Sequence, residues 1–240
     1  SAASDVYKRQ AVIAPGSTGA AVAAALFGLG RIKGIDRPVI ATPMPTVSGI
    51  TVMLDSGANS NSKPKHLVQG ALMGSEYAKL LLGKENPTVG LLNIGEEATK
   101  GNDVVLATYP ILEGMKTINF KGNIEGRDIP KGAVDVVVCD GFVGNVVLKF
   151  AEGLVTGLTQ LVKDSIMAGS IFAKIGAMLV KPALKKMAKR LDHTENGGAP
   201  LLGVNGVFMI AHGSSKAKEI KTAIEIASDL VERKIIQHIR

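Results

Sequence analysis

Short apolar runs that end in polar, glycine-containing loops recur along the chain. Residues 89–94 form such a run, which leads directly into residues 95–102 with two glutamates, two glycines, a lysine and an asparagine. This length and composition are typical of a strand covered on both faces in a parallel sheet. Residues 135–140 form a second strand of this kind, followed by the tip 141–145. Ligands bind beyond the carboxyl ends of strands in open parallel sheets, so the two loops predict a site.

The rest of the chain alternates between strand-like and helix-like patterns. Leu67, Leu72 and Leu80 recur at helical spacing after Pro64, a residue type that favours the first turn of a helix. Strands that alternate with helices at this spacing predict a layered α/β fold with a mainly parallel sheet. Further strands are predicted at residues 11–14, 37–42, 50–55, 117–120 and 206–211, and helices at 20–29, 64–82, 101–112, from 145 onward and 217–239.

Residues 151–191 interrupt this alternation because they contain no strand pattern. They predict two helices that meet near residues 168–170, and Pro182 is expected to kink the second. We expect residues 11–240 to form a single α/β domain with this helical pair inserted and projecting from it. The second helix carries Ile171, Phe172, Ile175, Met178 and Leu179 on one side and Lys174, Lys181, Lys185, Lys186, Lys189 and Arg190 elsewhere.

Composition and charge narrow the class of partner. Of the 240 residues, 46% are apolar and 4% aromatic, and Trp is absent. So few aromatic rings count against a platform that stacks the bases of a nucleic acid. The formal net charge of +7 favours acidic partners: phosphate-bearing ligands, an acidic protein, anionic lipid or nucleic acid.

Metal, dinucleotide and disulfide chemistry receive no support from the residues. A single cysteine, Cys139, excludes an intrachain disulfide and fits a reducing cytoplasm. No His, Cys and Asp cluster has zinc spacing. Gly28 and Gly30 are followed by Lys33 where a dinucleotide-binding motif needs its third glycine. No apolar stretch is predicted to span a bilayer.

Six sequence blocks together resemble PlsX-type phosphate acyltransferases, bacterial enzymes that convert acyl carrier protein thioesters to acyl phosphates. The blocks occur in the family's order and cover nearly everything from residue 11 onward. They are residues 15–20 (PGSTGA), 55–59 (DSGAN) with 63–64 (KP), 91–95 (LLNIG) with 100–102 (KGN), 118–123 (INFKGN) with 125–128 (EGRD), 135–149, and 197–202 (GGAPLL) with 211–215 (AHGSS).

The resemblance implies a three-layer α/β/α fold similar to that of phosphate acetyltransferases and isocitrate dehydrogenases. It also implies a homodimer that needs no metal or organic cofactor. Family members begin with a further α/β segment carrying a Met-Gly-Gly-Asp motif, which this sequence lacks, and residues 1–10 match nothing in the family. We therefore expect an N-terminally truncated chain with a flanking extension at residues 1–10. Ser17 also stands where the family usually has Asn.

The reaction implied by the resemblance is the attack of inorganic phosphate on an acyl thioester. Phosphate is already an anionic nucleophile, and a thiolate leaves readily because the pKa of its conjugate acid is only about 8.5. The site must instead hold phosphate and stabilise the oxyanion, which suits lysine, amide and backbone N–H donors. The expected catalytic residues are Lys100, Asn145 and His212, and the expected substrate-binding residues are Asn59, Lys63, Asn93, Gly95, Asn102, Asn123, Arg127, Asp140, Gly141 and Gly144.

Structural roles compete with these assignments. Asn145, near a strand-to-helix turn, fits an N-cap as well as a catalytic donor. His212 fits a structural residue somewhat better than a catalytic one, and Cys139 fits a core residue better than an acyl-carrying nucleophile. For the helical pair, dimer packing competes with contact to a membrane, in which the five apolar residues from Ile171 to Leu179 would enter the surface and the lysines would meet anionic headgroups.

The expected function is transfer of a fatty acyl group from acyl carrier protein to inorganic phosphate for phospholipid synthesis. The expected location is the cytoplasm, with peripheral attachment to an anionic membrane. One alternative is a phosphate acetyltransferase that uses coenzyme A, which shares the fold and the chemistry. A second is a non-catalytic membrane-binding fragment. Nucleic-acid binding has charge in its favour but no motif.

Overall fold

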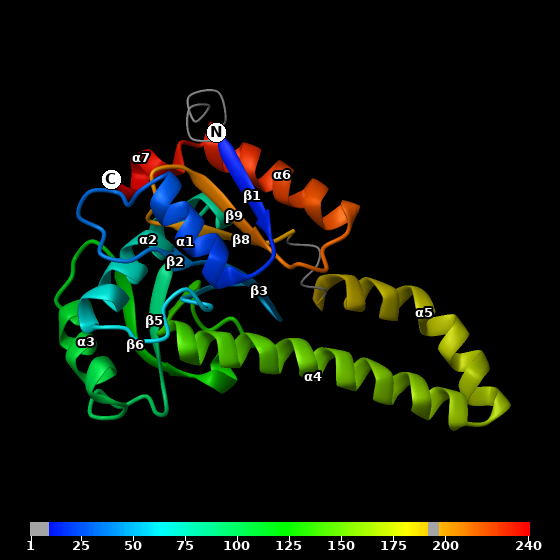
Figure 1. Cartoon of the computed structure of the whole chain (residues 1–240). Helices are drawn as coiled ribbons and strands as arrows, with labels where there is room; N and C mark the ends of the chain where they lie inside the picture. The colour runs from blue at the N-terminus through cyan, green and yellow to red at the C-terminus, as the bar shows by residue number, and fades with distance from the viewer. Residues whose placement is uncertain (1–9, 192–196) are drawn as a thin grey trace.

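Two β-sheets lie between two layers of helices in the computed structural model (Figure 1). The structure describes residues 10–191 and 197–240, without the side chains of residues 189–191. The expected flanking extension therefore falls, apart from residue 10, outside the described residues, as do the side chains of Lys189 and Arg190. The layers confirm the predicted three-layer α/β/α fold.

The larger sheet has five strands in the order β3-β4-β7-β5-β6. Strands β4, β7, β5 and β6 run parallel, and β3 pairs antiparallel with β4 at one edge. Side chains alternate across this sheet: Val136 and Val138 pack on the side of α2, whereas Val137 and Cys139 pack on the side of α4. The strands are β3 (Thr42–Thr46), β4 (Gly49–Leu54), β5 (Thr88–Asn93), β6 (Asn119–Glu125) and β7 (Val136–Val138).

The smaller sheet has four strands in the order β1-β9-β8-β2. Strands β1 and β9 are parallel, and β8 is antiparallel to both of its neighbours. One face packs against α1 through Phe208 and Ile210, and the other packs against α6 through Val207 and Met209. The elements are β1 (Ala11–Pro15), β2 (Val39–Ile40), β8 (Ala199–Leu202), β9 (Val207–Ala211), α1 (Thr18–Gly28) and α6 (Ala217–Glu232).

One continuous core joins the two sheets on a single side. It contains side chains of α2 (Pro64–Leu82), α3 (Asp103–Glu113), α6 and α7 (Ile235–Ile239), together with inward-facing residues of both sheets. Helices α1 and α4 cover the opposite side, each over its own sheet and its own smaller core.

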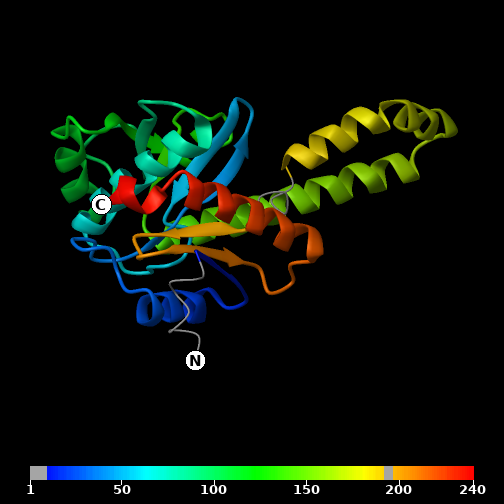
Figure 2. The same ribbon diagram turned by 90° about the horizontal axis from the view of Figure 1, so that it is seen from above.

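A helical arm extends from the body (Figures 1 and 2). It consists of α4 (Gly141–Ala168) and α5 (Ile171–Leu191). Val143, Val147, Leu148 and Ala151 hold the first turns of α4 against the larger sheet. By length and composition alone α4 could cross a membrane, which corrects the sequence expectation, although this test is also passed by helices of soluble proteins.

Several element boundaries differ from the sequence expectation. The arm begins at residue 141 rather than 151, because α4 is the helix that follows β7. Residues 37–42 contain the whole of β2 and the first residue of β3, and β8 was not predicted. The closing helix breaks at Lys234, whose backbone is left-handed at φ 55, into α6 and α7. Helix α5 continues through Pro182, and Figure 1 shows it bending along its length.

Candidate functional site at the carboxyl edge of the larger sheet

Four parallel strands of the larger sheet end at one edge. The carboxyl edge is defined here as the ends of β4, β7, β5 and β6, with loops 55–59, 94–102 and 126–128 and the first two turns of α4. Because β5 pairs directly with β7 and β7 with β4, the loops that follow these strands are neighbours. Adjacent strands lie about 5 Å apart. The structure therefore brings Lys100 and Asn145 to the ends of adjacent strands.

The loop after β5 is held by amide side chains and leaves a lysine free. Asn93 donates from Nδ2 to the Lys100 carbonyl at 2.9 Å and accepts from the Ile94 N–H at 2.8 Å. Asn102 caps α3, since its Oδ1 accepts from the Val105 N–H at 3.0 Å. The exposed Lys100 ammonium has no hydrogen bond or ion pair within the described residues. Lys100 is thus free to bind a ligand, whereas Asn93 and Asn102 shape its loop.

Two more of the predicted residues, Gly95 and Asn123, lie in or against this loop. A Cβ on Gly95 would lie 2.8 Å from a Glu97 carboxylate oxygen and 3.1 Å from Lys100 Cγ, both of which belong to exposed side chains that can shift. Asn123, on β6, donates to the Glu97 carbonyl at 2.9 Å and is 6% exposed. Asn123 therefore supports the loop that carries Lys100, and Gly95 is part of that loop.

Four of the predicted site residues lie at the start of α4: the N-cap Asp140 and, in the first two turns, Gly141, Gly144 and Asn145. Asp140 is the N-cap, and its Oδ1 accepts from the N–H groups of Phe142 and Val143, each at 2.9 Å. The N-cap alternative for Asn145 is therefore wrong. Asn145 instead lies in the second turn, exposed, with its Cγ 3.5 Å from the position of a Cβ on Gly57. Its amide has no hydrogen bond within the described residues.

The loop after β4 packs against these turns. Asn59 is 6% exposed and donates to the Pro38 carbonyl at 2.7 Å and to the Asp55 carboxylate at 2.8 Å, so it is part of the framework. Its carbonyl accepts from the Gly141 N–H at 2.9 Å. Lys63 follows at the start of α2, exposed to solvent, where its N–H donates to His66.

His212 and Arg127 lie at the margins. His212 follows β9 of the smaller sheet, and its Nε2 lies 3.8 Å from an oxygen of Glu152, three turns along α4 from the helix start. Arg127 is exposed and pairs with Glu125 at the end of β6. Neither side chain has a described contact with Lys100 or Asn145.

The thiol of Cys139 is suited to packing rather than attack. It is fully buried beside Asp55, and burial raises its pKa well above the ordinary value, with the carboxylates of Asp55 and Asp140 adding to the rise. A thiol held neutral and away from solvent is a poor nucleophile. This environment favours the core interpretation of Cys139.

An acidic trio lies at the same edge. Carboxylate oxygens of Glu96, Glu125 and Asp128 come within 4.8 Å of one another, the kind of grouping that can hold a cation. Protein cations already balance two of the three, since Arg127 pairs with Glu125 and Lys131 pairs with Asp128 at 2.8 Å. We assign no metal to these residues.

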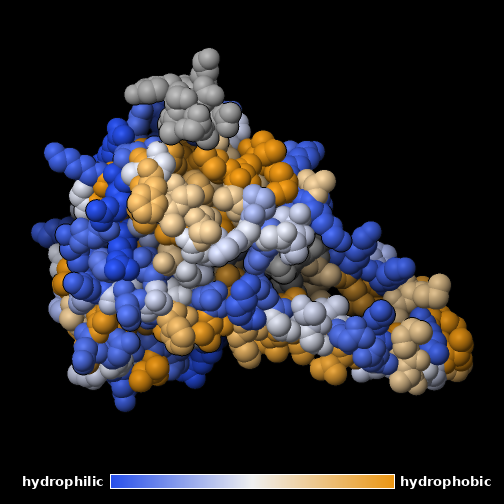
Figure 3. Space-filling model, viewed as in Figure 1, coloured by the Kyte–Doolittle hydropathy of each residue, from blue (hydrophilic) through white to orange (hydrophobic). Residues whose placement is uncertain are grey.

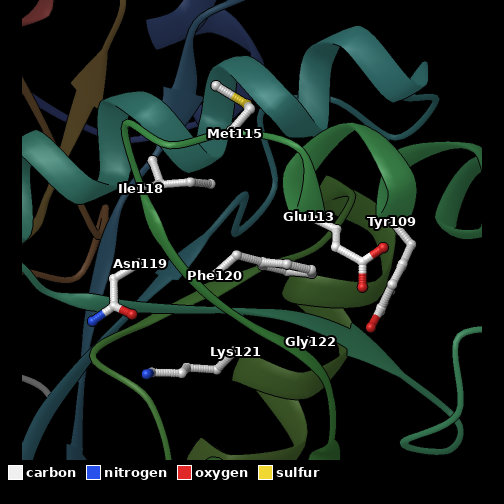
Figure 4. A pocket seen from close by; sticks show the side chains of 8 residues that line it. All are labelled: Tyr109, Glu113, Met115, Ile118, Asn119, Phe120, Lys121 and Gly122. Atoms are coloured by element: carbon white, nitrogen blue, oxygen red, sulfur yellow. The ribbon is translucent and has the colours of Figure 1, made fainter.

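A cavity of about 420 Å³ opens elsewhere, between the end of α3 and the first half of β6 (Figure 4). Tyr109 and Phe120 meet edge to face in its wall, with ring centres 5.4 Å apart. Glu113 and Lys121 also line it. Its lining residues from Ile118 to Gly122 belong to the sequence block 118–123, but none of the predicted site residues lines it.

Comparisons with known proteins agree on one family and one fold. A family profile described as "Fatty acid synthesis protein" matches residues 3–238. The chain is 57% identical over 231 residues to a phosphate acyltransferase of Desulfitobacterium hafniense (strain DSM 10664 / DCB-2), covering 96% of this chain and 69% of that protein. It is 56% identical over 233 residues to a phosphate acyltransferase of Heliobacterium modesticaldum, covering 97% and 69%.

Solved structures resemble the fold at low sequence identity. The EutD phosphotransacetylase from Staphylococcus aureus superimposes with a TM-score of 0.64 at 16% identity, covering 95% of this chain and 66% of that one. A phosphotransacetylase from Streptococcus pyogenes gives a TM-score of 0.62 at 16% identity, covering 96% and 66%. At this identity the likeness shows the fold alone.

Proposed function

Because the chain belongs to the fatty acid synthesis protein family, whose curated relatives are phosphate acyltransferases, we propose that it transfers a fatty acyl group from acyl carrier protein to inorganic phosphate. The acyl phosphate formed would serve phospholipid synthesis. The observation that supports this proposal is the meeting of four parallel strand ends at one edge, where Lys100 and Asn145 have side chains without a partner among the residues that the structure describes. The chain spans 69% of the length of the D. hafniense relative.

The reaction balances without a cofactor. An oxygen of hydrogen phosphate attacks the thioester carbon, a C–O bond forms and the C–S bond breaks. The thiolate leaves with the proton that the phosphate gives up, so the products are acyl phosphate and the free thiol. The protein must position the two reactants and stabilise the negative charge that develops on the carbonyl oxygen.

Two side chains have the chemistry for these tasks. The ammonium of Lys100 would bind phosphate and offset its charge, and the amide of Asn145 would donate to the phosphate or the oxyanion. Gly141 and Gly144 let the loop after β4 come close to α4, which keeps Asn145 in place. His212 would contact phosphate from the smaller sheet, and Lys63 and Arg127 would line the margin.

The choice of acyl donor rests on charge and on the arm. A net charge of +7 suits an acidic carrier protein. The phosphotransacetylase fold keeps acyl-CoA as the alternative donor. Turnover with a long-chain acyl carrier protein and with acetyl-CoA distinguishes the two, since the proposal predicts the higher kcat/KM with the first.

We further propose that the arm attaches the protein to an anionic membrane. Five predicted contact residues are exposed on α5, and apolar side chains are visible along the arm and at its far end (Figure 3). Lys174, Lys181, Lys185 and Lys186 share the helix and would meet the headgroups. The exposed fractions are 65% for Ile171, 80% for Phe172, 49% for Ile175, 73% for Met178 and 78% for Leu179.

A homodimer is the competing use of the same arm. Leu154, Leu158 and Leu161 recur along α4 and are 47%, 52% and 63% exposed, so a second copy could cover this stripe. The two uses are compatible if the stripe on α4 packs in the dimer while α5 meets lipid. Sedimentation velocity of Leu158→Asp separates them, because dimer loss without loss of vesicle binding assigns each surface its own role.

The activity is tested by trapping acyl phosphate as the hydroxamate. We expect Lys100→Ala and Asn145→Ala each to lower kcat/KM by roughly 10²- to 10³-fold, as for loss of a donor to a developing anion. Lys116→Ala is the matched control, because this exposed lysine follows α3 at the opposite end of the larger sheet. Near-normal turnover in Lys100→Ala would remove that residue from the site. No acyl phosphate from the wild type with either donor would contradict the proposed reaction for this chain.

A further inference from the structure

The Asp55 carboxylate is an unusual feature of the carboxyl edge, because it is 3% exposed yet fully engaged. Its Oδ1 accepts from the N–H groups of Ile40 at 3.0 Å, Gly57 at 3.2 Å and Ala58 at 3.0 Å. Its Oδ2 accepts from the N–H and from the side-chain amide of Asn59, both at 2.8 Å. Three consecutive residues of one loop therefore converge on a single carboxylate.

That loop forms the surface against which α4 begins. The Asn59 carbonyl accepts from the Gly141 N–H at 2.9 Å, and a Cβ on Gly141 would lie 2.9 Å from Asp55 Oδ2. A Cβ on Gly144 would lie 1.9 Å from the Asp55 carbonyl oxygen. The two glycines place α4 in direct contact with the Asp55 loop. The position of the first turns of α4 is thus set by the loop that Asp55 organises.

The contact between the Asp55 loop and α4 determines where the side chain of Asn145 lies. It lies one residue beyond Gly144, and its Cβ, Cγ and Oδ1 are all within 3.6 Å of where a Cβ on Gly57 would be. Gly57 has φ +133, a conformation that other residues rarely adopt, and its N–H is one of the donors to Asp55. Gly57 is therefore the one residue that contacts both the Asp55 carboxylate and the side chain of Asn145.

Asp55 also joins the two sheets at this edge. Ile40 belongs to β2 of the smaller sheet, whereas Asp55 directly follows β4 of the larger one. The adjacent Ser56 reinforces the junction, since its N–H donates to the Ile40 carbonyl at 3.2 Å and its hydroxyl meets that of Thr42 at 2.5 Å. The carboxylate thereby also links the smaller sheet to the larger one.

We propose that Asp55 is a positioning residue, whose carboxylate holds loop 57–59 so that the amide of Asn145 faces the reacting phosphate and thioester. It touches neither reactant and acts through Gly57 and α4. This role rests on the proposed acyl transfer. A purely structural role would stabilise the chain without a specific link between Asp55 and Asn145.

Asp55→Asn is the informative variant, because it keeps the size of the side chain and replaces an accepting oxygen with an NH₂ group that opposes the loop donors. We expect kcat to fall roughly 10- to 100-fold, the scale of a misplaced reacting group, with KM for the acyl donor little changed. Thr51→Val is the matched control. Thr51 lies on β4, the strand that precedes Asp55, and its buried hydroxyl donates to the Val134 carbonyl at 2.8 Å. The variant removes this hydrogen bond without changing loop 57–59, so kcat should stay unchanged.

A double-mutant cycle separates positioning from general destabilisation. If Asp55 acts through Asn145, then adding Asp55→Asn to Asn145→Ala should lower kcat by less than about threefold, because the amide to be positioned is already gone. A full repeat of the single-mutant loss in that background would overturn the proposal. If Asp55→Asn does not fold, Asn59→Ala, which removes one donor of the five, takes its place in the cycle with a smaller first effect.

Hydrogen exchange distinguishes failure of this inference from failure of the proposed reaction. In Asp55→Asn, the amides of residues 57–59 and 141–145 should exchange faster than in the wild type, and in Thr51→Val they should not. Unchanged exchange in Asp55→Asn would refute the positioning role whatever the activity. If exchange is faster in Asp55→Asn but the wild type forms no acyl phosphate, the loop's role in holding α4 is supported and only the proposed reaction is rejected.

Discussion

Two glycines of α4 differ in what surrounds them, and substituting each by alanine tests how tightly the carboxyl edge is packed. Gly144 lies in the first turn, where a Cβ would be 1.9 Å from the Asp55 carbonyl oxygen and 2.9 Å from Cys139 Sγ. Gly157 lies further along the same helix, where a Cβ would meet nothing within 4 Å. The same change of side chain is therefore made in a crowded and in an open position.

The expected effects have opposite signs. In an open helical position, alanine is favoured over glycine by about 0.5–1 kcal/mol, so Gly157→Ala should be stabilising by that amount. At Gly144 the new methyl group requires a shift of more than 1 Å from a backbone oxygen that cannot move freely. Asp55 is held by its N–H bond to the Cys139 carbonyl at 3.0 Å. Overpacking of this kind typically costs about 1–3 kcal/mol and can exceed the gain in helix propensity, so we expect a net loss near 2 kcal/mol.

Calorimetry of the two variants measures this contrast. For a chain of this size 1 kcal/mol corresponds to roughly 2–4 °C in Tm, so Gly144→Ala should melt about 4–8 °C below the wild type. Gly157→Ala should melt about 1–4 °C above it. A Gly144→Ala protein as stable as Gly157→Ala would show that the Asp55 loop does not press on α4, and the account of how Asn145 is held would fail.

Three further predictions concern other parts of the structure. Burial raises the pKa of Asp135, but hydrogen bonds from Lys84 and Thr88 lower it further and hold it below the ordinary value. The Asp135 carboxylate therefore stabilises the fold above about pH 4. Urea titrations should show Asp135→Asn about 1 kcal/mol less stable at pH 7, a difference that disappears as the pH falls through the lowered pKa of Asp135; a constant difference would contradict it. Asp140→Ala removes the N-cap of α4 and should cost about 1 kcal/mol by the same assay, and no loss would mean that the cap is dispensable. Phe172→Asp should weaken sedimentation with anionic vesicles at least 10-fold, as loss of an aromatic ring buried in the membrane implies, whereas Phe27→Asp, which changes a still more exposed ring on α1, should not; equal effects would reject the arm as the membrane contact.

The sequence predicted where strands end more reliably than what each polar residue does there. Residues 89–94 are apolar enough to specify a buried strand, and parallel pairing then placed the loops after β5 and β7 at one edge. Asparagine, however, suits helix caps, loop braces and ligand contacts equally well. Asn93 and Asn102 turned out to brace and cap, and only contacts in three dimensions separate them from Asn145.

Long-range contacts were beyond the reach of the sequence for a physical reason. Asp55 gains its role from Ile40, 15 residues earlier in a different sheet, and His212 meets Glu152 across 60 residues of chain, with no spacing that marks either pair. Strand β8 escaped prediction because its four residues contain Pro200 and follow two glycines, a composition typical of a turn. The break between α6 and α7 depends on the left-handed backbone of Lys234, and a lysine in the sequence does not predict that conformation.

A crystal structure of the chain with phosphate bound tests the central claim most directly. We expect one phosphate at the carboxyl edge of the larger sheet, with its oxygens within about 3 Å of both Lys100 Nζ and Asn145 Nδ2. Phosphate found only at a place remote from both residues, or Lys100 and Asn145 each too far from it to share one anion, would contradict the account.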